Sequence, residues 1–166
     1  MSGNLSAIVK SSRTRLALRV LGALLLVFVG ADHYYEYSVD DYSVLPTIGT
    51  LFLLNFISAT AFGLILLAPL DRILHRFGRI TLQLASLSGF GIAATSLVAL
   101  LISEHTKLFG FMESNYRPAI IVAIVSEASA AVILLLVFIA SWGDRRPARH
   151  PKASLANHSQ PSAGTP

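Results

Sequence analysis

Glu127 is the residue whose position most strongly suggests chemistry, because it is an acid inside an apolar segment. It is the only formally charged residue within three long apolar segments, 47–70, 80–102 and 119–142. Moving a carboxyl group into hydrocarbon is costly, so acids inside membrane-spanning segments are rare and are functional candidates by default. Glu127 is therefore the first candidate for a functional site.

Further polar residues are expected at the depth of Glu127. Glu127 and Asn55 each come eight residues after the start of their apolar segments. At about 1.5 Å per residue, both lie roughly 12 Å below the same membrane boundary. Thr95 and Ser96 reach a similar level on a segment that runs the opposite way, and Ser126 adjoins Glu127. The sequence thus predicts an intramembrane polar layer of Glu127, Asn55, Thr95 and Ser126.

Two interpretations of Glu127 are open from the sequence. As a structural clasp, a protonated Glu127 would donate a hydrogen bond to Asn55 or Thr95 and hold the helices together. As a functional group, it would exchange a proton or contact a substrate, because burial favours the neutral form of a carboxyl group. We expect a non-enzymatic subunit or small-ligand binder, with a small proton-coupled transporter or exporter that uses Glu127 as the alternative. No nucleophile–base pair or cofactor motif points to an enzyme.

A second candidate site consists of His33, Glu36, Asp40 and His105, near the ends of the first and third apolar segments. Imidazole and carboxylate groups together suit zinc or another divalent ion, although their spacing matches no established metal motif. His33 and His105 are alternatively paired haem ligands, because the first and third helices of an up-down bundle lie diagonally and leave room for a macrocycle. A haem- or metal-binding redox protein is therefore a further alternative, although we expect no cofactor. The chain has no cysteine, which excludes thiolate metal sites.

The elements that carry these residues are predicted to be membrane-spanning helices. The 166 residues are 54% hydrophobic and 13% charged, whereas soluble domains carry about 25% charged residues. The segments 47–70, 80–102 and 119–142 each exceed the roughly 20 residues that cross a bilayer. A fourth segment, 16–31, also has features of a signal peptide, but we expect it to span, with Arg19 extending to the headgroups. The prediction is an all-α, four-helix transmembrane bundle over residues 16–142 with up-down topology.

Basic residues predict the orientation of the bundle. Eleven of the 13 Lys and Arg residues fall in the N-terminal arm with the start of the first segment, in the loop between the second and third segments, or in the tail. By the positive-inside rule both termini are cytoplasmic, and we expect the plasma membrane. The net charge of +4 then favours anionic lipid at the cytoplasmic face as a partner, and not nucleic acid. Residues 1–15 are predicted to be a basic arm and 143–166 a disordered basic tail, and a homo- or hetero-oligomer is left open.

One stretch of the chain resembles a known group of proteins. His33, Tyr42 and the run Leu45 to Asn55 (LPTIGTLFLLN) are similar to a stretch in uncharacterised small four-span integral membrane proteins of actinobacterial type. The resemblance covers the first span, the first outer loop and the start of the second span. It implies a plasma-membrane protein and supplies no catalytic or ligand residues.

Overall fold

The computed structural model describes residues 12–110, 112 and 118–142, and every regular element in these residues is helical. In chain order the elements are α2 (Ser12–Ser38), η1 (Tyr42–Val44), α3 (Pro46–Leu67), α4 (Leu70–Ile73), η2 (His75–Phe77), α5 (Gly78–Ser103) and α6 (Pro118–Trp142). The predicted all-α class is therefore confirmed for this part of the chain. Most of the predicted N-terminal arm, and the predicted tail 143–166, lie outside the described residues.

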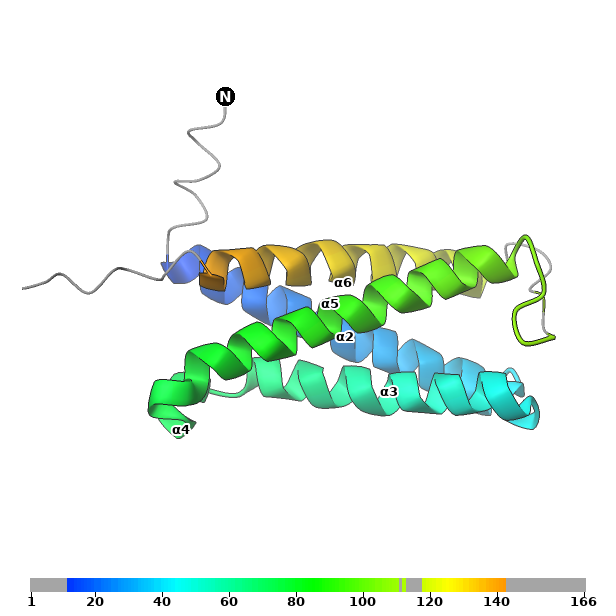
Figure 1. Cartoon of the computed structure of the whole chain (residues 1–166), viewed down its shortest axis with the longest axis horizontal. Coiled ribbons are helices and arrows are strands. Elements are labelled where there is room, and N and C mark those ends of the chain that lie inside the picture. Colours follow the sequence, from blue (N-terminus) through cyan, green and yellow to red (C-terminus); the bar gives the residue numbers. More distant parts are fainter. Residues whose placement is uncertain (1–11, 111, 113–117, 143–166) are drawn as a thin grey trace, which may run out of the picture.

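The four long helices run alternately in opposite directions along the bundle (Figure 1). α2 packs against α3 and α6, and α5 also packs against α6 and α3. Consequently α2 lies diagonally across from α5, and α3 lies diagonally across from α6. We call the end at which α2 and α5 finish the η1 end, and the opposite end, where α4 lies, the α4 end.

All four long helices are long and apolar enough to cross a membrane. Large apolar side chains also remain exposed along each of them, for example Leu24, Leu64, Leu84 and Val132. A soluble protein rarely leaves so much apolar surface uncovered, whereas lipid tails are as apolar as these side chains. These features are those of a small polytopic membrane protein.

The largest difference from the predicted spans is at the first helix. α3, α5 and α6 begin and end within three residues of the predicted segments, whereas α2 continues past residue 31 to Ser38. This continuation is polar but partly buried, because His33 and Glu36 are only 7% and 5% exposed. Both follow Val29 at helical spacing and share its buried face. The end of the first helix predicted from hydropathy alone is therefore seven residues too early.

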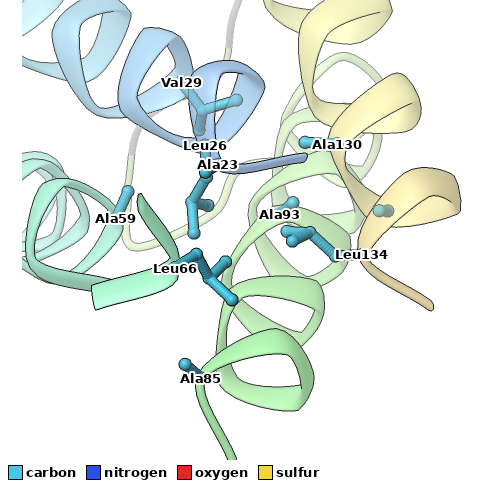
Figure 2. Close-up of a cluster of buried hydrophobic side chains, with 10 residues drawn as sticks. Ala23, Leu26, Val29, Ala59, Leu66, Ala85, Ala93, Ala130 and Leu134 are labelled. Atoms are coloured by element: carbon cyan, nitrogen blue, oxygen red, sulfur yellow. The ribbon is translucent and has the colours of Figure 1, made fainter. Parts of the chain in front are cut away.

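Small residues form much of the buried core. Figure 2 shows the cluster, in which labelled alanines surround Leu26, Leu66 and Leu134. The alanines labelled there are Ala23, Ala59, Ala85, Ala93 and Ala130. Small side chains let helix backbones approach each other, which is how membrane helices associate when lipid removes the hydrophobic driving force.

Arg19 joins α2 to the end of α3. Its guanidinium donates through Nε to the carbonyl oxygen of Leu66 at 2.6 Å, and through Nη2 to that of Ala68. The last carbonyls of a helix lack partners within the helix and carry the negative end of its dipole, so a cation stabilises them. Arg19 therefore caps the end of α3.

α2 and α3 approach closely at Gly30. A Cβ atom at this position would lie 2.8 Å from Thr60 Oγ1 and 3.2 Å from the carbonyl oxygen of Phe56. The latter atom belongs to the backbone of a helix and cannot move aside without moving α3. A Cβ atom at Gly91, on α5, would meet nothing within 4 Å.

We expect Gly30→Ala to destabilise the protein by roughly 1–3 kcal/mol, because it overpacks the contact between α2 and α3. Gly91→Ala is the matched control, and we expect it to leave stability unchanged or slightly raised. The free energy of unfolding of each variant in detergent micelles measures the difference. Equal effects of the two substitutions would contradict the close contact of α2 with α3.

Candidate functional site

A cavity of about 210 Å³ lies at the η1 end of the bundle. Residues of α2, η1, α3, α5 and α6 enclose it. Apolar side chains form most of the wall, among them Ile48, Leu51, Leu100 and Ile120. An engineered apolar cavity of about 150 Å³ holds benzene, so this cavity has room for a small organic ligand.

Glu127 lies on the wall of this cavity and is 1% exposed. The hydroxyl of Ser96, on α5, donates a hydrogen bond to Glu127 Oε1 at 2.6 Å. The other carboxyl oxygen, Oε2, is buried and has no hydrogen-bond partner among the described residues. Because buried polar atoms are nearly always paired, this oxygen is the atom of the site that most needs a ligand or a water molecule.

His33 reaches the same hydroxyl from α2. Its Nδ1 lies 2.9 Å from the carbonyl oxygen of Val29, one turn earlier in the helix. Its Nε2 lies 2.8 Å from Ser96 Oγ and 3.6 Å from Glu127 Oε1. We call His33, Ser96 and Glu127 the triad, and it connects α2, α5 and α6.

The triad satisfies its hydrogen bonds only when it holds one shared proton. A carbonyl oxygen cannot donate, so Nδ1 of His33 carries a hydrogen, and Nε2 of the neutral ring is then an acceptor. The single hydroxyl hydrogen of Ser96 cannot serve both Nε2 and Glu127 Oε1. In one arrangement, a protonated Glu127 donates to Ser96, and Ser96 donates to Nε2 of His33. In the other, a protonated His33 donates from Nε2 to Ser96, and Ser96 donates to Glu127 Oε1. Each arrangement satisfies both contacts. Both arrangements have zero net charge.

The rest of the polar wall is acidic. Asp32 and Glu36 line the cavity from α2, and no Lys or Arg is among the described residues that line it. The ring of Phe52 packs against two other rings of the wall, with centroids 5.1 Å from His33 and 5.0 Å from Tyr42. The cavity therefore combines carboxyl groups with an aromatic and apolar surface.

Asn55 and Ser126 lie close to where the sequence placed them but do not bind Glu127. Asn55 lines the cavity, and its buried Oδ1 has no hydrogen-bond partner among the described residues. It belongs to α3, which lies diagonally across the bundle from α6. Ser126 is buried, and its hydroxyl donates to the carbonyl oxygen of Ala123 on its own helix. Of these two residues only Asn55 lines the cavity together with Glu127.

Thr95 does not belong to the polar layer, which corrects the sequence-based prediction. Thr95 lies on an exposed side of α5, and the next residue, Ser96, points to Glu127. Successive residues of a helix are about 100° apart around its axis. Counting residues from the start of a segment therefore gives the depth of a residue but not the side of the helix on which it lies. His33 is missing from the predicted layer because the first span was expected to end before it.

The four predicted metal or haem ligands do not form one site. No group of three or more His, Asp or Glu side chains in the described residues could hold a metal ion. Both ring nitrogens of His33 already lie within hydrogen-bonding distance of Val29 or Ser96. His105 is exposed, and its Nδ1 lies 2.9 Å from the carbonyl oxygen of Leu101. Glu36 lines the cavity, whereas Asp40 follows the end of α2 and is not among the lining residues.

Comparison with known proteins does not supply a function. The chain matches no family model, no curated protein and no solved structure. The functional assignment therefore depends on the chemistry of the cavity and the triad.

We expect Ser96→Ala to destabilise the protein by about 1–3 kcal/mol, because it leaves His33 Nε2 and Glu127 Oε1 buried without their shared partner. Thr95→Ala is the matched control, since it removes a hydroxyl from the exposed side of the same helix turn. Unfolding of both variants in the same detergent provides the comparison. An equal loss of stability in Thr95→Ala and Ser96→Ala would contradict the assignment of Ser96 to the triad.

Proposed function

We propose that this chain is a non-enzymatic integral membrane protein that binds a small ligand in the cavity at the η1 end. The observation that carries the proposal is Glu127 Oε2, a buried carboxyl oxygen on the cavity wall with no partner among the described residues. The buried Oδ1 of Asn55 on the same wall is a second such atom. A few polar groups on a mainly apolar wall are typical of small-molecule sites.

The order of groups in the triad argues against a serine hydrolase. In such enzymes the acid orients the histidine, and the serine hydroxyl gives its proton to that histidine while it attacks. Here Nδ1 of His33 meets the backbone carbonyl of Val29, and the acid meets the serine itself. Ser96 also lies within α5, where no sharp turn presents its hydroxyl to a substrate. Ser96 is better suited to pass a proton between His33 and Glu127 than to attack a substrate.

The orientation with both termini in the cytoplasm is part of the proposal. Arg72, Arg76 and Arg79 lie in and beside the short connection at the α4 end, and α2 begins at that end with Arg13 and Arg15. The positive-inside rule assigns this basic end to the cytoplasm and to contact with anionic lipid. The cavity then lies in the outer half of the plasma membrane. The resemblance of the segment His33 to Asn55 to small four-span membrane proteins of actinobacterial type supports the plasma membrane as the location.

A proton-coupled transporter or exporter is the second candidate function. The triad favours it, because His33 and Glu127 satisfy their contacts with Ser96 by sharing one proton. The two functions differ in whether the bound ligand crosses the membrane. Uptake of the bound ligand into proteoliposomes separates the two functions. A transporter takes up the ligand and loses this activity in Glu127→Gln, whereas a binding protein shows no uptake.

The ligand-binding function predicts stabilisation by benzene-sized probes. Benzylamine, benzyl alcohol and benzoate have the same ring and differ in charge, so the set covers a cation, a neutral molecule and an anion. We expect at least one of them to raise the unfolding temperature, since a ligand at about ten times its Kd stabilises the folded state by roughly 1.4 kcal/mol.

Filling the cavity provides the control for this measurement. Ala123 lines the cavity, whereas Ala61 is exposed on α3. The shift is expected to disappear in Ala123→Phe and to persist in Ala61→Phe. If none of the three probes shifts the wild-type protein, or if Ala123→Phe responds as the wild type does, the cavity is not a ligand site.

A further inference from the structure

The titratable groups around the cavity define the charge of a ligand that fits it. Asp32, His33 and Glu36 face it from α2, Tyr42 from η1 and Glu127 from α6. The lining residues of α3 and α5 include no titratable carboxyl, imidazole or basic group. No Lys or Arg is among the described residues that line the cavity, so each of its carboxyl groups that is ionised contributes a negative potential, which attracts cations and repels anions.

The aromatic and apolar walls define the rest of the ligand. Phe52 stacks on Tyr42, with ring planes inclined by 23°. Organic cations bind to the faces of such rings, most strongly where water is excluded. Leu51, Leu100 and Ile120 offer hydrocarbon contacts on the same wall. A bare metal ion would gain nothing from these side chains, whereas a cation with an apolar group would use both surfaces.

We propose that the cavity binds a small organic cation, an amine or quaternary ammonium group with one apolar substituent, in exchange for the proton that the triad shares. This inference rests on the proposed ligand-binding function. The cationic group would lie beside Glu127 Oε2, the buried carboxyl oxygen that has no partner among the described residues. The apolar substituent would lie against Phe52 and the aliphatic wall.

Charge balance at the triad favours the exchange. The triad has zero net charge when it holds its proton, in either arrangement of that proton between His33 and Glu127. A cation beside Glu127 would add a positive charge at a site of low dielectric, which is unfavourable unless the charge is compensated. Release of the proton to bulk water leaves an ionised Glu127 with a neutral His33, so the charge in the cavity is unchanged by binding. One proton therefore leaves for each cation that enters.

The test uses the purified full chain in detergent and two series of binding measurements. At constant pH, we expect benzylamine to bind at least tenfold more tightly than benzyl alcohol, and benzoate not to bind. In the second series the probe is benzyltrimethylammonium, whose charge does not change with pH. Since its binding releases a proton, its affinity should rise with pH, by up to tenfold per pH unit.

Two variants assign the proton to the triad. Glu127→Gln cannot release a proton, so we expect it to abolish the pH dependence. Glu104→Gln removes the same group near the end of α5, outside the cavity, and should keep the pH dependence of the wild type. If Glu127→Gln does not fold, the probe series and the pH series of the wild-type protein still decide the proposal.

The outcomes separate this inference from the proposed function. Equal binding of benzyl alcohol and benzylamine would overturn the cationic ligand and leave a ligand-binding cavity. Affinity for benzyltrimethylammonium that does not change with pH, or a dependence lost in Asp32→Asn and kept in Glu127→Gln, would overturn the exchange at the triad. Failure of every probe to bind would overturn the proposed function as well.

Discussion

A carboxyl group inside a membrane-spanning bundle must find hydrogen-bond partners, and the arrangement at the η1 end depends on how Glu127 finds them. Its partner is the hydroxyl of Ser96, which His33 approaches from the other side. This contact connects α2, α5 and α6, although α2 and α5 are diagonal neighbours whose backbones approach each other at few places. The polar connection uses one carboxyl oxygen, Oε1, and the other, Oε2, is buried without a hydrogen-bond partner among the described residues.

Small residues make the diagonal contact between α2 and α5 feasible. A Cβ atom at Gly89 of α5 would lie 2.7 Å from a methyl group of Leu26, so α2 and α5 meet closely in the core of the bundle. Nearer the η1 end, the same two helices present His33 and Ser96 to each other. The apolar core thus sets the distance between α2 and α5, and at that distance His33 and Ser96 can form a hydrogen bond. Beyond the triad the helices leave the cavity open.

The sequence specified the spans and the depth of the polar groups better than their partners. Long apolar segments predict helices directly, and Glu127 was rightly expected to face the bundle. Asn55 and Thr95 were placed by counting residues along their segments, but the face of a helix that packs inward depends on crossing angles that one sequence does not reveal. His33 was expected beyond the end of the first span, because histidine is polar and hydropathy ends an apolar segment before such a residue. Its burial depends on contacts with Val29 and Ser96, which only the folded bundle brings together.

The coupling between His33 and Glu127 tests the central claim most directly. In a double-mutant cycle with His33→Ala and Glu127→Gln, groups of one hydrogen-bond network give interaction free energies of about 0.5–3 kcal/mol. We predict a value in this range for His33 with Glu127, and additive effects for Asn55→Ala with Glu127→Gln. Additive effects for His33 and Glu127, together with coupling between Asn55 and Glu127, would contradict the triad and restore the clasp predicted from the sequence.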